Sequence, residues 1–250
     1  MEDGRMKDRI RSHWNTRASG YDRNVRHVIF FRRDKAVWQR IFAEFLGEDR
    51  HKILDVGTGP GIVANLISGM GYDVTGIDAS EMMLAKAREN SATLHNSVEL
   101  VLADAENLPF SEASFDAVVN RYVLWSLPDP KNAIAQWHRV LRPGGRLVVV
   151  DGNWYRDGQN KPWTKKLWAF VSSALVERRW PGDQSTNDDG WRERLWSSNA
   201  KRPDADIEIL REIGFKDIAV VANLNRKLLT TLDYLKWGHS GDQFLITGVK

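Results

Sequence analysis

The chain has 250 residues, of which 42% are apolar and 28% are charged, and its formal net charge at pH 7 is +3. This composition is typical of one globular α/β domain with appended segments. The chain contains no cysteine, which excludes disulfides, thiolate metal sites and a cysteine nucleophile. No apolar run approaches the roughly 20 residues of a membrane span, and the charged N-terminus lacks the apolar core of a signal peptide. We therefore expect a cytoplasmic protein.

Two amphipathic helices are predicted at the N-terminus. The first covers residues 7–21, with its apolar side chains on one face and arginines on the other. The residues of the apolar face are Ile10, Trp14, Ala18 and Tyr21. The second helix is expected at about 34–46, and Gly47 ends it. Much of the basic excess lies in residues 5–40, where it indicates either a solvated helix face, which we adopt, or an arm for nucleic acid.

From residue 52 the pattern changes to an alternation of short strands and helices. The apolar strands are expected at residues 52–56, 73–78, 98–104, 115–120 and 146–151. The intervening helices are expected after the glycines to about Gly69, from the N-cap Ser80 to about Asn90, and through Ile134 to Leu141, where the sequence RPGG ends the last of them. Short apolar strands separated by helices indicate a parallel sheet that is covered on both faces.

The alternation breaks at residues 153–205, a segment that holds six tryptophans. It resumes with a helix at about 204–213, a strand near 217–223 and a last strand at 243–249. We interpret the interruption as an insertion into one domain. Its tryptophans either fix an irregular cap onto that domain or line a pocket for a flat or cationic ligand.

The sequence ILDVGTGPGIVANL at 53–66 predicts a ligand-binding turn. Asp55 ends the strand, and Gly57, Gly59 and Gly61 follow at alternate positions before a helix begins. Glycine suits positions where φ is positive or where a Cβ would collide with a ligand, and the helix N-terminus offers free N–H groups. Asp78 follows about 20 residues later, where a carboxylate can accept both hydroxyl protons of a ribose. The pattern indicates an adenosine-type ligand and leaves a nicotinamide cofactor open.

Five ordered motifs separate these alternatives. They are D-x-G-x-G-x-G at 55–61, GIDASEMM at 76–83, ADAENLPF at 103–110, SFDAVVNRYVLWSLPDP at 114–130 and RVLRPGG at 139–145. Together they resemble the class I S-adenosylmethionine-dependent methyltransferases, in particular the small-molecule branch with the C-methyltransferases of ubiquinone and menaquinone synthesis. The resemblance covers residues 10–151 and, more loosely, the last strand. It implies a Rossmann-like, seven-stranded α/β sheet with helices on both faces, an antiparallel last strand and S-adenosylmethionine as cofactor.

The resemblance also implies a domain organisation and a set of cofactor contacts. Residues 1–250 form one domain, with a helical lid (1–47), a cofactor-binding core (48–152), a Trp-rich cap insertion (153–205) and the C-terminal part of the sheet (206–250). The glycine loop is expected under the methionine part of the cofactor, Asp55 at its amino group, Asp78 at the ribose and Asp104 at the adenine. The implied cofactor-binding residues are Tyr21, Asp55, Gly57, Thr58, Gly59, Gly61, Asp78, Ala79, Met83, Asp104, Ala105, Asn120 and Arg121.

Candidates for the chemistry follow from the requirements of methyl transfer. Displacement at a sulfonium requires alignment, exclusion of water and a deprotonated nucleophile, and ligands of open α/β sheets bind beyond the carboxyl ends of the strands. This geometry nominates Tyr21, Arg121, Tyr122 and Asp151 as catalytic residues. Asp151 is expected either to act as a base or amine anchor, or to cap a turn. His27 is either a base or a surface histidine.

We predict transfer of a methyl group from S-adenosylmethionine to a small organic acceptor, with no metal, nucleic-acid or membrane partner. No N-P-P-[YF] motif follows the fourth strand, which argues against a DNA base as substrate. The alternatives are an RNA or protein methyltransferase that uses the basic N-terminal arm, and a non-catalytic protein that binds S-adenosylmethionine. The sequence decides neither the acceptor atom (O, N, S or C) nor between a monomer and a homodimer.

Overall fold

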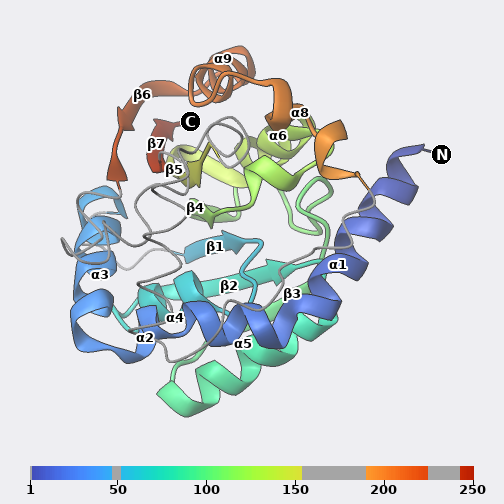
Figure 1. Cartoon of the computed structure of the whole chain (residues 1–250). Helices are drawn as coiled ribbons and strands as arrows, with labels where there is room; N and C mark the ends of the chain where they lie inside the picture. The colour runs from blue at the N-terminus through green and yellow to red at the C-terminus, as the bar shows by residue number, and fades with distance from the viewer. Residues whose placement is uncertain (1, 47–51, 154–189, 225–242) are drawn as a thin grey trace, which may run out of the picture.

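A twisted seven-stranded sheet forms the centre of the molecule (Figure 1), in the order β3-β2-β1-β4-β5-β7-β6. The computed structural model describes residues 2–46, 52–153, 190–224 and 243–250. Strand β7 runs antiparallel to both of its neighbours, and the other strands run parallel. The expected fold class is therefore confirmed. The strands are β1 (Lys52–Val56), β2 (Asp73–Asp78), β3 (Glu99–Leu102), β4 (Phe115–Arg121), β5 (Leu141–Gly152), β6 (Lys216–Val221) and β7 (Gln243–Val249).

Helices cover both faces of the sheet, and the longest, α1, packs along α5 (Figure 1). The α-helices of the described part are α1 (Glu2–Val25), α2 (His27–Phe30), α3 (Arg32–Leu46), α4 (Ile62–Ser68), α5 (Glu81–Leu94), α6 (Pro130–Val140), α8 (Trp196–Asn199) and α9 (Asp204–Ile213); short 3-10 turns are η1 (Leu124–Ser126) and η2 (Arg192–Arg194). The first predicted helix thus extends in both directions, and the short α2 was not predicted. None of the described helices is long and apolar enough to span a bilayer.

The apolar strands are buried on both sides because successive side chains point to opposite faces. In β1, Leu54 and Val56 join the apolar cluster covered by α6 and α9, whereas Ile53 joins the cluster covered by α3 and α4. In β4, Val118 and Val119 divide in the same way. A strand that is buried on both faces has no solvent-facing side, so its sequence is continuously apolar instead of alternating between apolar and polar residues.

Strand β5 begins earlier than the sequence indicates. Leu141, which we expected in the helix, already pairs with Phe115, and the next pair in register is Arg146 with Ala117. The residues between them form an irregular stretch in which Gly144 has a φ of 79°. The Gly144 N–H donates to the carbonyl of Lys250 over 3.0 Å. Pro and Gly ordinarily mark a turn. The sequence RPGG therefore predicts a turn, and it does not show that the chain joins the sheet directly after α6.

The predicted cap insertion (153–205) lies largely outside the described residues, as do four of its tryptophans, at positions 154, 163, 168 and 180. The other two tryptophans are described. Trp191 is buried beside Leu195 and Trp125, and the Trp196 indole donates to the carbonyl of Leu124 over 3.1 Å. Both rings therefore contribute to packing at the end of β4. The division into lid, core, cap and C-terminal part stays a prediction.

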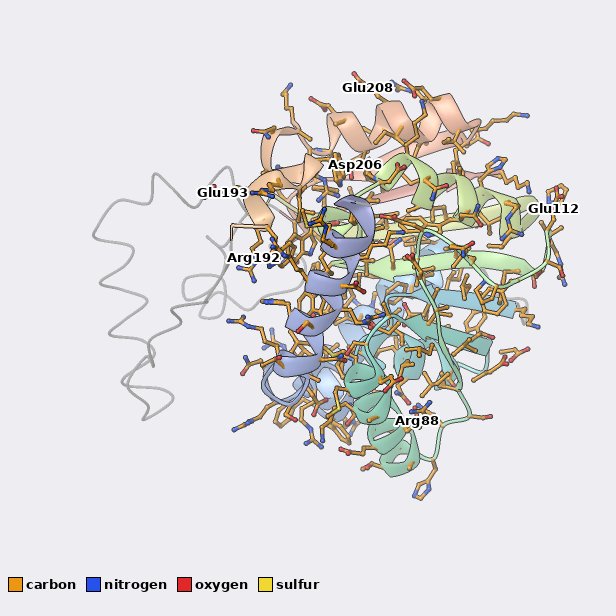
Figure 2. The ribbon with its side chains drawn as sticks, turned by 90° about the vertical axis from the view of Figure 1, so that its right-hand side faces the viewer. Arg88, Glu112, Arg192, Glu193, Asp206 and Glu208 are labelled. Carbon is orange, nitrogen blue, oxygen red and sulfur yellow. The ribbon has the colours of Figure 1, made fainter. Side chains whose placement is uncertain are left out.

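A buried group of charges ties β5 to the C-terminal helices. The Arg202 guanidinium lies 2.9 Å from Asp151 and 2.5 Å from Asp206, and all three side chains are at most 1% exposed. Figure 2 shows Asp206 on the inner side of α9 and Glu208 on its outer side. Burial works against the charge of Arg202, but the two carboxylates outweigh it and raise its pKa. The guanidinium is therefore charged and holds both carboxylates in place.

We predict that Arg202→Met destabilises the fold by about 3–5 kcal/mol, because it leaves two buried carboxylates without a cation. Urea unfolding followed by circular dichroism measures the loss. Arg211→Met is the matched control, since Arg211 is exposed on α9, the helix that follows Arg202, and its substitution is expected to change stability by less than about 0.5 kcal/mol. Equal effects of the two substitutions would contradict the anchoring role of Arg202.

Candidate functional site

A cavity of about 400 Å³ opens where β1, β2 and β4 end, beneath α1. Its wall comes from α1 and from the segments that follow β1, β2, β3 and β4. Ligands of parallel α/β sheets bind at this edge because the loops there are free of the sheet. The structure brings together most of the predicted site residues: the wall includes Tyr21, Asp55, Gly57, Thr58, Gly59, Asp78, Ala79, Met83, Asp104, Ala105, Arg121 and Tyr122.

Gly57 and Gly59 in the glycine loop are required for two different physical reasons. Gly57 has a φ of 65°, and a Cβ there would lie 2.4 Å from a methyl carbon of Val123, so packing alone requires glycine. Gly59 has a φ of 56°, but a Cβ there would meet no atom closer than 4.0 Å. The backbone at Gly59 therefore borders open space in the cavity wall, as expected where a ligand approaches the main chain.

Asp55 lies behind this loop, at the end of β1. Its carboxylate is 1% exposed and accepts hydrogen bonds from the Thr58 hydroxyl at 2.6 Å and from the Ala64 N–H at 3.0 Å. Burial raises the pKa of Asp55 to about 7. Near neutral pH this group is therefore poised between its two protonation states, and a cationic ligand group would favour the ionised one.

Asp78 joins the glycine loop to the start of α5. It accepts the Gly59 N–H at 2.9 Å and the Ser80 N–H at 2.8 Å. Ser80 caps the helix, as predicted, by accepting the Met83 N–H at 3.1 Å. Burial raises the pKa of Asp78 to about 6. Two backbone N–H groups thus fix the carboxylate in the cavity wall, where it can accept the hydroxyl protons of a ribose.

The far end of the cavity is held by α1. The Lys7 ammonium lies 2.7 Å from Asp104 and 2.5 Å from Glu106. Burial opposes the charge of Lys7, but its contacts with the two carboxylates prevail and raise its pKa. Sequence reasoning missed Lys7 and Glu106. A signal was present, since Lys7 stands three residues before Ile10 and so shares the predicted apolar face of the helix.

Aromatic and basic groups gather where β4 ends. The guanidinium carbon of Arg121 lies 4.8 Å from the ring centre of Trp38 and 4.5 Å from that of Tyr122. The Tyr122 hydroxyl donates to Gln243 over 2.8 Å, and Tyr21 meets Trp14 edge to face at 5.5 Å. Burial raises the pKa of Tyr21 and of Tyr122. Both phenols therefore keep their protons at neutral pH and are able to donate hydrogen bonds.

Three predicted site residues do not line the cavity. Gly61 is buried, and a Cβ there would lie 2.9 Å from the amide nitrogen of Asn65. Asn120 is fully buried, and neither of its side-chain polar atoms has a hydrogen-bond partner in the described part of the chain. Asp151 is fully buried and accepts the Trp125 N–H at 2.9 Å. The close approach of Asn65 indicates that Gly61 is required for packing.

The placement of Asp151 removes the geometric basis for its predicted role as a base or amine anchor. Its carboxylate is bound by Arg202 and by the N–H of Trp125 at the start of η1. Sequence reasoning placed Asp151 correctly at the end of β5 but could not show Arg202, which lies 51 residues further along the chain. We assign Asp151 to holding η1 against the sheet, and thereby to shaping the cavity wall that follows β4.

Trp137 is fully buried in the apolar cluster covered by α6, whereas Met82 is 48% exposed. The ring centre of His138 lies 4.9 Å from that of Phe215 in an edge-to-face contact. Among the residues described, no group of three or more His, Asp or Glu side chains is arranged to bind a metal.

Comparison with known proteins relates this chain to methyltransferases. Residues 54–149 match the family described as "Methyltransferase domain". A demethylmenaquinone methyltransferase of Staphylococcus epidermidis is 33% identical over 153 residues, which span 60% of this chain and 63% of that enzyme. Both matches support a similarity of this part of the chain to the class I S-adenosylmethionine-dependent methyltransferases. The match covers less than two thirds of the length of the relative.

Solved structures of other methyltransferases share the fold. Phosphoethanolamine N-methyltransferase 2 of Haemonchus contortus, solved with phosphomonomethylethanolamine and S-adenosylhomocysteine, has a TM-score of 0.59 at 19% identity, over 87% of this chain and 57% of that one. A methyltransferase of Aquifex aeolicus has a TM-score of 0.55 at 18% identity, over 84% of this chain and 88% of that one. S-adenosylmethionine is the cofactor of this family, and the open wall at Gly59 with the fixed carboxylate of Asp78 fits its adenosine.

We predict that Asp78→Ala weakens the binding of S-adenosylhomocysteine by about 1.5–3 kcal/mol, or about 10- to 150-fold, because hydrogen bonds to a charged group are lost. Isothermal titration calorimetry measures the change. Asp73→Ala is the matched control, because Asp73 is exposed at the opposite end of β2. NADH is expected not to bind to the wild-type protein, and its binding in place of S-adenosylhomocysteine would contradict the site described here.

Asp55 generates a prediction about pH. Its pKa of about 7 means that the carboxylate is ionised above pH 7 and protonated below it. We propose that it receives the ammonium group of the cofactor, so the affinity for S-adenosylhomocysteine should rise from pH 6.5 to pH 8, by at most about tenfold per pH unit. Asp55→Asn is expected to bind more weakly at pH 8 and to show a flatter profile. A wild-type affinity that is independent of pH in this range would contradict the role.

Proposed function

We propose that this methyltransferase transfers the methyl group of S-adenosylmethionine to a small organic acceptor. The observation that carries the proposal is the position of α1, which contributes Lys7, Ile10, Trp14 and Tyr21 to the wall of the cofactor cavity. A helix in this position leaves a bounded space next to the cofactor and excludes water from it. A compact acceptor suits such a space better than a folded polymer does.

The basic residues of the N-terminus support the same reading. Lys7 is paired with Asp104 and Glu106, and Arg11 is paired with Asp8 at 2.8 Å. These two cations face the cavity wall and have carboxylate partners within the protein. The helix thus covers the cavity. The positive charges of Lys7 and Arg11 are already paired within the protein, which leaves them less available to a polyanion.

The residues of the cavity wall hold the ligands in position and contribute less to proton transfer. When bound, S-adenosylmethionine supplies an electrophilic methyl group on a sulfonium. Asp55 and Asp78 would hold two ends of one ligand, and Tyr21 and Tyr122 add protonated phenols to the cavity wall. No histidine belongs to the described cavity wall. This arrangement suits an acceptor that is itself nucleophilic, such as an amine, a thiolate, a phenolate or an enolate, and catalysis by alignment.

The relatives support a small acceptor by their names. The S. epidermidis enzyme is named for demethylmenaquinone, and the H. contortus enzyme was solved with phosphomonomethylethanolamine; both are small organic molecules. The two names point to different compounds, so neither compound is assigned to this chain.

A panel assay tests the proposal. The protein is incubated with methyl-labelled S-adenosylmethionine and separate pools of amines, thiols, phenols, quinols and carboxylic acids, and in parallel with total RNA and protein extracts. Label is expected in one small-molecule pool, with turnover that changes less than about twofold between 50 and 200 mM salt. An enzyme held on RNA by 6–10 phosphate contacts would lose about 10³–10⁵ in affinity over that range. Asp78→Ala is expected to lose turnover at low cofactor concentration.

Other outcomes would support the alternatives. Label in RNA or protein, lost steeply with salt, would favour a macromolecular acceptor bound by the N-terminal arginines. Tight binding of S-adenosylhomocysteine without transfer to any pool would favour a non-catalytic binding protein.

A further inference from the structure

One cation in the cavity wall, Arg121, has no carboxylate partner among the residues that the structure describes. The described wall holds three cationic side chains, Lys7, Arg11 and Arg121. Lys7 and Arg11 are paired with carboxylates. No described carboxylate lies within 4.0 Å of Arg121. A partly buried guanidinium without a counter-ion is costly, so its presence at the ligand cavity calls for an explanation.

The contacts of Arg121 orient its guanidinium group and use only part of its hydrogen-bonding capacity. The rings of Trp38 and Tyr122 lie 4.8 Å and 4.5 Å from the guanidinium carbon, an arrangement in which aromatic faces meet the plane of the cation. Arg121 also donates a side-chain hydrogen bond to Tyr122. The Nε–H is buried and has no acceptor among the described residues.

The surroundings keep the positive charge of Arg121 uncancelled. Asp55 is the carboxylate that responds to Arg121, but it is already bonded to Thr58 and Ala64. The tyrosines near Arg121, Tyr21 and Tyr122, are neutral phenols. The end of β4 therefore presents to the cavity a planar, positively charged group whose Nε–H has no acceptor among the described residues.

We propose that Arg121 is an oxyanion receptor, which binds a carboxylate or phosphate group of a ligand inside the cavity. The planar fork of a guanidinium matches two oxygens of such a group. Two ligands can bring this chemistry to Arg121. One is the cofactor, whose methionine part carries a carboxylate beside the ammonium that we assign to Asp55. The other is the acceptor, in which case the proposal rests on the proposed function and narrows it to an acidic acceptor.

Binding measurements test the proposal without any need for turnover. Wild-type protein, Arg121→Gln and Arg121→Lys are titrated with S-adenosylhomocysteine and with its decarboxylated analogue, S-adenosyl-3-thiopropylamine, which keeps the ammonium. Arg88→Gln is the matched control, because Arg88 is exposed on α5 and points away from the cavity (Figure 2). Thermal unfolding of each variant establishes that it is folded.

If the cofactor is the source, the wild-type protein binds S-adenosylhomocysteine at least tenfold tighter than the decarboxylated analogue. Arg121→Gln removes that difference by weakening only the carboxylate ligand, Arg121→Lys retains part of it, and Arg88→Gln leaves it unchanged. If both proteins bind both nucleosides alike, the acceptor arm applies. The complexes with S-adenosylhomocysteine are then titrated with sodium phosphate and sodium acetate at constant ionic strength, and the wild-type complex is expected to bind one of these anions at least tenfold tighter than the Arg121→Gln complex does.

The proposal is overturned if neither arm shows a difference between wild-type protein and Arg121→Gln. That outcome is distinct from a failure of the proposed function, which would appear as absence of transfer in the panel assay while the carboxylate preference of the binding site persisted.

Discussion

One buried amide determines how α1 meets the glycine loop. Asn90 of α5 donates to Asp22 of α1 at 2.8 Å and to the carbonyl of Pro60 in the glycine loop at 2.9 Å. Asp22 is 6% exposed and Asn90 is 3% exposed, so each group depends on the other for its hydrogen bond. The amide holds three separate segments at a fixed distance, and the cavity lies between them. The positions of Tyr21 and Gly59 follow from this constraint.

The sequence predicts the parts of this protein that follow local rules. The limits of β1, β2, β7 and α9 agree with the structure because each is set by apolar pattern and by neighbouring caps or glycines. The glycine loop and Asp78 were found because close approach to a nucleoside needs those residue types at that spacing.

The sequence does not show which residues meet across the fold. Trp38 reaches Arg121 from α3, and Arg202 reaches Asp151 from beyond the tryptophan-rich segment. Each pairing is decided by tertiary packing, and no periodicity records it. Asp151 illustrates the cost: its place at a strand end is typical of a catalytic group, yet a distant cation makes it a structural anchor. The pairing of Lys7 with Asp104 and Glu106 was missed for the same reason, although the sequence predicted the helix that carries Lys7.

The two ends of α1 are held by contacts of different physical kind, so dissolved salt affects them differently. Near its C-terminal end, Asp22 is held by the buried amide of Asn90, which salt does not screen. Near its N-terminal end, Lys7 and Asp104 are 35% and 39% exposed, where dissolved ions weaken the attraction between charges. Salt therefore weakens the Lys7–Asp104 contact at that end of the cavity more than the buried contacts of Glu106 and Asp22. Exchange of a bound nucleoside should accordingly begin at that end and quicken as ionic strength rises.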